Sequence, residues 1–250
     1  YTVEELDAII GFYKTFSDGL LKPMLCKMAK NVTNKATFDL HYWASRKIDG
    51  IRTLIYYDGK EIHAKSRTAI SLDFPLYHII SHPLLKKLFK ANPDLILDGE
   101  AYKHGLPLST ISGICRNNST AKDLGKLEFY MYDIVDIDLP FHDRLKKMYR
   151  IKRLLNLDFN PYRIWKKGEL KIQFVPQVAV TGWDNMMKLH NQYVEEGWEG
   201  LVVRLDTAKY GPGKRNNNMI KIKKYKENTF KCIGIEQGLR PYDDMVFIME

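Results

Sequence analysis

The sequence has 250 residues, is 45% hydrophobic and carries a formal net charge of +9. This composition is that of an ordinary globular protein and allows one large domain, or one domain plus a fragment. There is no apolar run long enough to cross a membrane and no signal-peptide pattern at the start, so we expect a cytoplasmic or nuclear protein that is not secreted. The basic charge favours a polyanionic partner, with a solvated basic surface as the alternative.

The cysteines argue against two kinds of structural site. Cys26, Cys115 and Cys232 are far apart and lack a CxxC pair, which indicates neither a disulfide framework nor a zinc site. We expect buried, reduced thiols. Because the first residue is Tyr1 and not methionine, we also expect the sequence to be an excerpt.

The first 22 residues predict an N-terminal helix or extension. Thr2 and Glu5 have the spacing of a capping box. The apolar residues that follow recur at helical spacing and are Leu6, Ile9, Ile10, Tyr13 and Phe16. The pattern predicts an amphipathic helix that ends before Gly19.

The segment Lys47 to Arg52 reads Lys-Ile-Asp-Gly-Ile-Arg and suggests a lysine nucleophile. A lysine amine is protonated at neutral pH, so a nucleophile needs positive neighbours that lower its pKa and a polar partner that orients it. Arg52 and Asp49 are candidates for these two roles. By itself the segment also fits an ordinary turn before a strand.

Strands follow directly after this segment. Residues 53–57 and 60–66 flank Asp58-Gly59, which predicts a β-hairpin. A strand at 95–97 runs into Asp98-Gly99-Glu100, and another at 127–135 ends near several aspartates. We therefore expect acidic groups at strand ends, where a carboxylate can hold a hard cation.

The second half adds helices at 142–156 and 183–196 and strands at 171–175, 200–205 and 219–225, which together predict an α+β fold. The loop at 210–215 is not a phosphate-binding loop, because Ala208 and Arg215 stand where that motif requires glycine and serine or threonine.

Five residues allow both a functional and a structural interpretation. Lys221 and Lys223 share one strand face and can hold a phosphate, or they are solvent-facing lysines of an edge strand. Tyr132 can stack on a base or pack in the core. Glu100 and Glu199 can hold Mg²⁺ if they face each other, and are otherwise surface or ribose-contacting acids.

The order of these segments resembles the covalent nucleotidyltransferases and, among them, the ATP-dependent DNA ligases, especially compact viral and phage forms. The resemblance spans residues 23–225. The segments that carry it are Lys47 to Arg52, Ser66-Arg67, Asp98-Gly99-Glu100, Phe129 to Asp133, Glu199 to Arg204 and Lys221-Ile222-Lys223. It implies an α+β nucleotidyltransferase (adenylation) domain at 23–227, made of antiparallel sheets flanked by helices.

The resemblance also implies roles for single residues. Lys47 would attack the α-phosphate of ATP to form lysyl-AMP. AMP would then pass to a 5′-phosphate, and a 3′-hydroxyl would displace it. The cofactor and substrate contacts implied are Ser45 at the adenine edge, Arg52 and Glu100 at the ribose, Tyr132 and Val202 on the two faces of adenine, Lys221 and Lys223 at the α-phosphate, and Arg67 at the 5′-phosphate of the nucleic acid. Glu199 and Glu100 would hold Mg²⁺, or Mn²⁺ in its place.

The implied protein is a monomer that seals nicks in duplex DNA during replication, repair or recombination, in the host cytoplasm if it is viral. Residues 228–250 would begin an OB-fold, with strands at 229–235 and 245–249. The family's last basic motif is absent, so we expect this chain to load itself poorly. Glu227 also stands near the hinge, where the family often has aspartate.

Two other functions remain open. An RNA ligase or an mRNA-capping guanylyltransferase uses the same lysine chemistry, and the capping enzyme would load GMP; the run Leu108 to Arg116 looks more like the ligase pattern. A catalytically inactive nucleic-acid-binding module would bind nicks without a covalent nucleotide.

Overall fold

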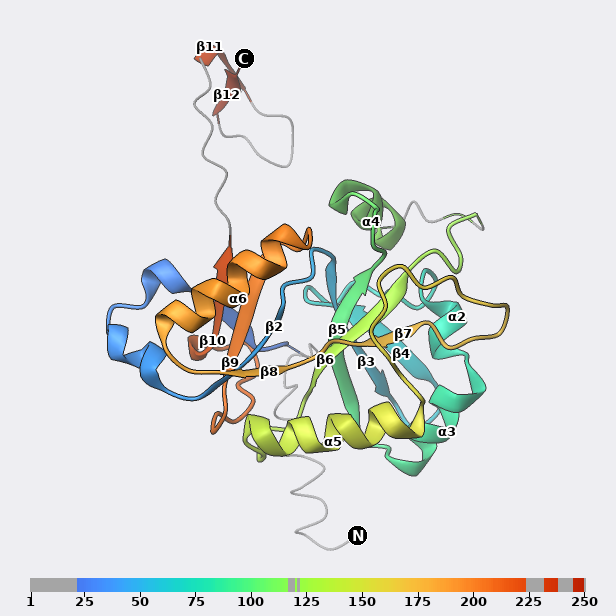
Figure 1. Ribbon diagram of the computed structural model, residues 1–250. Coiled ribbons are helices and arrows are strands. Elements are labelled where there is room, and N and C mark those ends of the chain that lie inside the picture. Colours follow the sequence, from blue (N-terminus) through green and yellow to red (C-terminus); the bar gives the residue numbers. More distant parts are fainter. Residues whose placement is uncertain (1–21, 117–119, 121, 224–231, 238–244, 250) are drawn as a thin grey trace, which may run out of the picture.

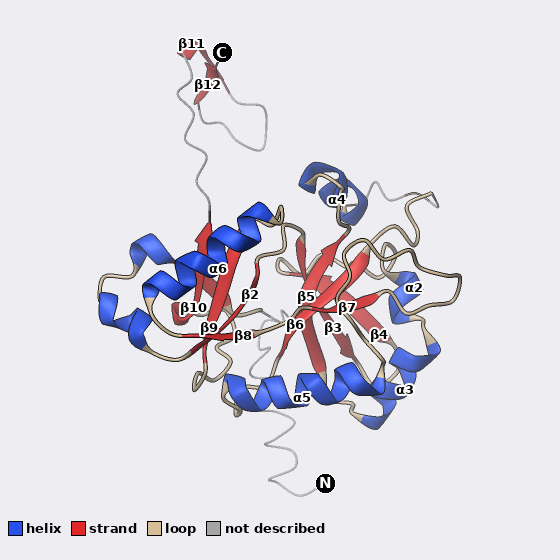
Figure 2. Cartoon of the chain, in the orientation of Figure 1, coloured by secondary structure: helices blue, strands red, loops and turns tan. Residues whose placement is uncertain are grey.

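The computed structural model describes residues 22–116, 120, 122–223, 232–237 and 245–249. The predicted N-terminal helix lies outside these residues, as does Glu227. Figure 1 shows two sheets next to each other with helices packed around them, and Figure 2 shows the same view by type of element. The α+β expectation is confirmed.

The first sheet has the strand order β1-β10-β9-β2-β8. Its strands are β1 (Leu25–Met28), β2 (Tyr42–Arg46), β8 (Val178–Val180), β9 (Gly200–Leu205) and β10 (Arg215–Lys223). The pairs are antiparallel except β1 with β10, which is parallel. This sheet brings residues from the beginning, middle and end of the chain together.

The second sheet has the order β4-β3-β5-β6-β7. Its strands are β3 (Ile51–Tyr57), β4 (Ile62–Ser66), β5 (Ile96–Tyr102), β6 (Glu128–Ile134) and β7 (Ile172–Phe174). The predicted hairpin is confirmed, since β3 pairs with β4 and the Asp58 carboxylate accepts hydrogen bonds from the backbone N–H groups of Lys60 and Glu61. Gly59 takes a φ of +95°, which glycine adopts without strain.

The helices surround the two sheets (Figure 1). They are α2 (Tyr77–Ile80), α3 (Pro83–Ala91), α4 (Leu108–Cys115), α5 (Phe141–Leu154) and α6 (Trp183–Glu195), with short 3₁₀ turns at Ala29–Asn31 and Lys35–Asp39. The predicted helices at 142–156 and 183–196 correspond to α5 and α6. α5 buries Phe141, Leu145, Met148 and Ile151 at helical spacing, which explains why it packs on β6.

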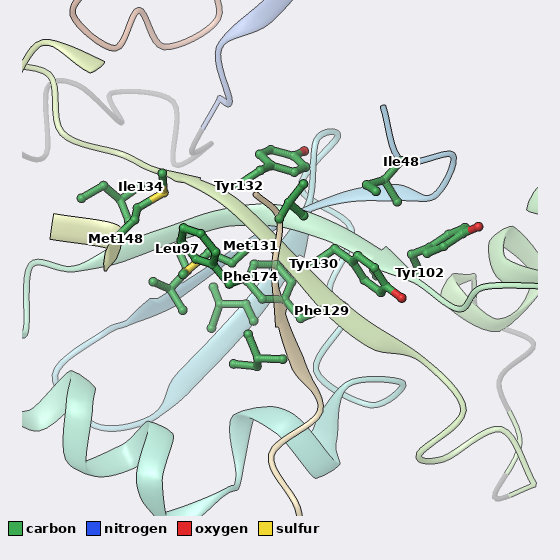
Figure 3. Close-up of a cluster of buried hydrophobic side chains, with 14 of the residues drawn as sticks. Ile48, Leu97, Tyr102, Phe129, Tyr130, Met131, Tyr132, Ile134, Met148 and Phe174 are labelled. Atoms are coloured by element: carbon green, nitrogen blue, oxygen red, sulfur yellow. The ribbon is translucent and has the colours of Figure 1, made fainter. Parts of the chain in front are cut away.

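One hydrophobic core connects the two sheets. Figure 3 shows its centre, where aromatic and aliphatic side chains of β5 and β6 pack together with Ile48, Met148 and Phe174. Ile48 follows Lys47 in the chain and is only 4% exposed. The nucleophile candidate is therefore attached to a buried anchor.

Two sequence expectations are corrected here. Asp98 and Glu100 lie inside β5, so these two acids do not sit at a strand end. β6 does end near aspartates as expected, since Asp133 is its penultimate residue and Asp136 and Asp138 follow it. β5 continues beyond its apolar residues Ile96 and Leu97, because its backbone forms hydrogen bonds with β3 on one side and β6 on the other. β10 also begins at Arg215, four residues before the predicted position, because its first residues pair with β1.

Beyond residue 231, β11 (Cys232–Gln237) and β12 (Met245–Met249) form an antiparallel pair. The expected strand at 245–249 is confirmed, and β11 overlaps the strand expected at 229–235. An OB-fold remains a prediction. In the part of the chain that the structure describes, no helix is long and apolar enough to cross a membrane.

Candidate active site

Strand register places three predicted site residues in one row across the first sheet. Ser45 of β2 is the partner of Val202 of β9, and Val202 is in turn the partner of Lys221 of β10. Directly paired residues share a sheet face, so the three side chains project to the same side. Ile220 and Ile222 point the other way and are buried, which confirms the alternation expected for β10.

Lys47 lies just past the end of β2. Its backbone N–H donates to the carbonyl oxygen of Gly200 at 2.9 Å. Its ammonium forms an ion pair with one carboxylate oxygen of Glu199, and Lys223 pairs with the other oxygen. The direct ion-pair partner of Lys47 is therefore Glu199, which immediately precedes the strand that pairs with β2. Asp49 belongs to the same cluster, because its carboxyl group forms a hydrogen bond with Glu199 and its charge interacts with Lys47.

This ion-paired cluster fixes the charge states of its members. Burial alone would raise the pKa of Glu199, but hydrogen bonds and charges from Lys223 and Lys47 together lower it. Burial lowers the pKa of Lys221, and the neighbouring cations Lys223, Lys47 and Arg215 add to this effect. Glu199 thus stays an anion between cations, which suits a site that receives phosphates.

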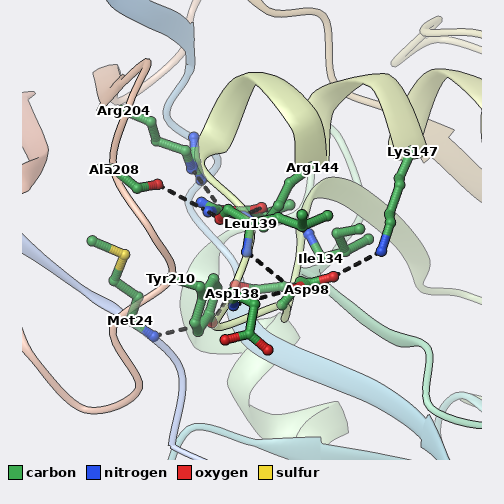
Figure 4. A network of polar contacts seen from close by, with 12 residues as sticks. Met24, Asp98, Ile134, Asp138, Leu139, Arg144, Lys147, Arg204, Ala208 and Tyr210 are labelled. Carbon is green, nitrogen blue, oxygen red and sulfur yellow. Dashed lines mark hydrogen bonds and ion pairs between the residues drawn. The ribbon is translucent and has the colours of Figure 1, made fainter.

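The second sheet contributes Arg52 from β3. Its Nε and Nη2 donate to the two carboxylate oxygens of Asp98 at 2.6 and 2.5 Å. Asp98 is fully buried and also accepts from the Tyr210 hydroxyl at 2.7 Å, which in turn accepts from Met24 N–H at 3.0 Å (Figure 4). Arg52 was expected to act on Lys47 as a positive neighbour, but the structure pairs its guanidinium with Asp98.

Glu100 and Tyr132 form a pair on the same face of the second sheet. The Tyr132 hydroxyl donates to Glu100 Oε2 at 2.8 Å, and the ring is 6% exposed. Burial raises the pKa of Glu100 to about 7, although the charge of Arg52 opposes the shift. The guanidinium carbons of Arg52 and Arg204 lie 5.0 and 4.9 Å from the Tyr132 ring centroid. Cation–π contacts therefore hold this ring in place.

A buried polar network behind Tyr132 was missed from the sequence. Asp133 is 1% exposed and accepts from Arg144 of α5, whose Nε is 2.9 Å away (Figure 4). Arg204 Nε lies 3.4 Å from the other Asp133 oxygen. The sequence did contain an indication of Arg204. It follows Val202 by two positions in the same strand, and side chains two positions apart project to the same face of a sheet.

Eight of the ten predicted site residues line one cavity between the sheets. They are Ser45, Lys47, Arg52, Arg67, Glu100, Tyr132, Val202 and Lys221. Lining residues that sequence reasoning did not single out are Pro23, Met24, Leu25, Cys26, Arg46, Ile48, Arg204 and Arg215. Lys223 and Glu199 are not among the lining residues, and they connect to the cavity through Lys47.

The predicted metal ligands are not brought together as a cluster. Glu199 forms ion pairs with two lysines, and Glu100 accepts a hydrogen bond from the Tyr132 hydroxyl. Within the described residues there is no group of three or more histidine, cysteine, aspartate or glutamate side chains that could hold a metal ion. A divalent cation at this site would therefore need oxygens from a bound substrate in addition to these carboxylates.

Comparison with known families decides among the alternatives. A family model for the ATP-dependent DNA ligase domain matches residues 23–223. The chain belongs to this ligase family. The matched range contains every predicted site residue, and the expected family is thereby confirmed.

Relatives of this ligase-family chain come from archaea and viruses. It is 30% identical to a DNA ligase of Archaeoglobus fulgidus over 205 residues, which cover 77% of this chain and 34% of that protein. It is 28% identical to a DNA ligase of African swine fever virus over 238 residues, covering 90% and 52%. The chain thus spans about half of the viral relative and a third of the archaeal one.

The ligase fold is also shared with solved structures. Chlorella virus DNA ligase-adenylate aligns with a TM-score of 0.60 and 18% identity, covering 91% of this chain and 79% of that one. At this identity the likeness establishes the fold and leaves the residue roles to the geometry described above.

Proposed function

We propose that this chain is the catalytic core of an ATP-dependent DNA ligase that seals nicks in duplex DNA. The observation that carries the proposal is the common cavity, in which the Lys47 nucleophile candidate meets residues from both sheets. The relatives are DNA ligases, and the Chlorella virus enzyme of the same fold was solved as an adenylate. A covalent AMP on Lys47 is the corresponding intermediate here.

In the first step, Lys47 Nζ attacks the α-phosphorus of ATP. The neutral amine forms a phosphorus–nitrogen bond, the bond from the α-phosphorus to the α–β bridging oxygen breaks, pyrophosphate leaves with that electron pair, and the proton of the amine passes to water. Glu199 holds the Lys47 amine, and Lys221 places a positive charge in the cavity where the α-phosphate would develop negative charge. Lys223 supports this arrangement by fixing the second oxygen of Glu199.

The nucleoside would occupy the remainder of the cavity. Tyr132 and Val202 line it from the two sheets and would enclose adenine, while Arg52 and Glu100 lie on the same face of the second sheet for the ribose. Arg67, exposed at the end of the β3–β4 hairpin, also lines the cavity and would meet the 5′-phosphate of the nick. Phosphate contacts of this kind position a substrate.

In the later steps, an oxygen of the 5′-phosphate attacks the phosphorus of lysyl-AMP and releases Lys47. The 3′-hydroxyl then attacks the 5′-phosphate, a phosphodiester forms and AMP leaves. Glu199 and Glu100 supply hard oxygen ligands that fit Mg²⁺, or Mn²⁺, together with substrate phosphates and water. Such an ion, when bound, would neutralise developing charge on the phosphates.

The direct test is sealing of a fluorescent nicked duplex with ATP and Mg²⁺ by the 250-residue chain, with Lys47→Ala as the inactive control. We expect a joined DNA strand and a monomeric enzyme in light scattering. Sealing of only an RNA strand would move the assignment to RNA ligase. A chain that binds nicks, forms no adduct and also fails to seal a pre-adenylated nick, which needs no loading of Lys47, would be an inactive binding module.

A further inference from the structure

The loop at 159–168 leads from α5 to the edge strand β7 (Figure 1). Among the described residues, it carries the two most exposed large hydrophobic side chains, Ile164 at 92% and Tyr162 at 74%. The loop contains no acidic residue and three basic ones, which are Arg163, Lys166 and Lys167. Exposed apolar side chains that stand together with cations indicate a surface that binds a partner.

Contacts on both sides of the exposed tip hold the 159–168 loop in one shape. The backbone of Asn160 exchanges two hydrogen bonds with the side chain of Gln173 in β7, which is fully buried. The guanidinium group of Arg163 pairs with Asp158 and Glu169, which flank the loop, at 2.8 and 3.1 Å. The exposed side chains are therefore presented on a fixed backbone, which loses little conformational entropy when a partner binds.

The 159–168 loop adjoins the cavity proposed to hold the nucleotide. The ring centroid of Phe159 lies 5.3 Å from the guanidinium carbon of Arg46, which lines that cavity. The same ring lies 5.8 Å from the ring of Trp198, the residue before Glu199. A large substrate that reaches Lys47 and extends beyond the cavity can therefore meet this loop as well.

Lys166 and Lys167 supply the charge that this loop can offer to a partner. Both side chains are exposed, and among the described residues no carboxylate lies within ion-pair distance of either ammonium group. Ammonium groups bind phosphates as point charges, and apolar side chains such as Ile164 fit the sugar and base edges of a minor groove. This combination fits a nucleic-acid duplex better than an apolar protein surface, which would leave the two charges without partners.

We propose that the 159–168 loop is a contact site for duplex DNA outside the cavity and holds the duplex arm on one side of the nick. Lys166 and Lys167 bind backbone phosphates, and Ile164 lies with Tyr162 against the edge of the minor groove. The inference rests on the proposed function, because it takes the nick to lie at the cavity. The loop positions the DNA and takes no part in formation of lysyl-AMP, since none of its side chains lines the cavity.

Binding of a nicked duplex tests the inference with the full 250-residue chain. A fluorescent duplex whose nick lacks the 3′-hydroxyl is titrated by anisotropy at several salt concentrations, and formation of the AMP adduct is followed in parallel by intact mass. Lys166→Gln with Lys167→Gln should weaken binding about tenfold in low salt and reduce the slope of log affinity against log salt by about 2, because each lysine neutralises about one phosphate. Lys86→Gln with Lys87→Gln, an adjacent exposed pair on α3, is the matched control and should bind like wild type.

Ile164→Ser tests the apolar part of the contact. We expect about fivefold weaker binding with an unchanged salt slope, since the substitution removes apolar surface from the complex and no charge. Leu154→Ser, whose side chain is 72% exposed on α5, is the matched control for an exposed aliphatic side chain. All four variants should form the AMP adduct at the wild-type rate, because none of these residues lines the cavity.

Several results would overturn the inference. Equal binding by wild type and both loop variants would show that DNA does not meet the loop, and would point to a protein partner for its exposed tip. Equal losses in the loop variants and their controls would show an effect of overall charge or surface polarity and no site. Slower formation of the AMP adduct in a loop variant would place the loop in the loading step instead. A wild-type chain that loads AMP but does not bind the duplex would overturn this inference alone, whereas a chain that does neither would overturn the proposed function as well.

Discussion

The two sheets contribute charged groups of different character to one cavity. In the first sheet, Lys47, Glu199 and Lys223 form a partly exposed cluster in which one carboxylate is shared by two ammonium groups. In the second sheet, Arg52 is bound bidentately by Asp98, which is fully buried. The first arrangement can exchange partners when a substrate arrives, whereas the second cannot do so without leaving a buried charge unpaired.

This difference in burial separates the residues proposed to act on the substrate from the residues that hold them in position. In the proposed mechanism, the groups that change bonding partners lie in the partly exposed cluster, and the groups that hold Arg52 and Tyr132 in place lie in buried networks. This division predicts that substitutions in the two regions will act on different measurable quantities.

The largest expected effect is on stability. Asp98→Ala removes the partner of Arg52 and of the Tyr210 hydroxyl, and should lower the free energy of unfolding by about 3–5 kcal/mol in urea denaturation. Glu199→Ala should lower it by about 1 kcal/mol or less, because that carboxylate is partly exposed to solvent. Equal losses in the two variants would erase the distinction between the sheets.

The next effect is on activity. Lys221→Ala removes a positive charge that lines the cavity and should slow adduct formation with ATP by about 10². Its unfolding free energy should change little. Lys87→Ala, an exposed lysine of α3, controls for the loss of one positive charge. Normal loading by Lys221→Ala would remove this residue from the mechanism.

A smaller effect concerns pH. Because burial raises the pKa of Glu100 to about 7 in the folded protein, its protonated form is the one that folding favours. The contribution of Glu100 to the free energy of unfolding is therefore fully present below about pH 4.5 and is lost as the pH rises through 7. Wild type should lose roughly 1–3 kcal/mol relative to Glu100→Gln across this window. A constant difference between the two unfolding curves would contradict the assignment.

The smallest effect is expected on the protein surface. Lys147 is 49% exposed and pairs with Asp136 at 2.8 Å, so Lys147→Ala should change the unfolding free energy by less than about 0.5 kcal/mol. Arg144, one turn earlier on α5, is buried against Asp133 and serves as the contrast. Arg144→Ala should cost several kcal/mol. Similar values for the two variants would mean that burial does not govern these ion pairs.

Local patterns were sufficient for some parts of the molecule. The Asp58-Gly59 hairpin and the alternation of Ile220, Lys221 and Ile222 depend on neighbours in sequence, and both were predicted correctly. The predicted strand at 95–97 was too short, because the length of β5 depends on its pairing with β3 and β6 on either side. Periodicity carries no information about such distant partners.

Pairings across the chain explain what the sequence did not reveal about the site. Lys47 meets Glu199 across 152 positions, and Arg204 meets Ser45 across 159. Asp49 was the local candidate partner of Lys47, and the antiparallel pairing of β2 with β9 adds Glu199, which makes the direct ion pair. Ordered motifs identified the members of the site, and strand register then determined their contacts.

The most direct test of the central claim is the intact mass of the protein after incubation with Mg²⁺ and either ATP or GTP, with Lys47→Ala in parallel. The proposal predicts an AMP adduct on the wild-type chain, no adduct on the variant and no GMP adduct on either. An AMP adduct that persists in Lys47→Ala, or a GMP adduct on the wild-type chain, would contradict it.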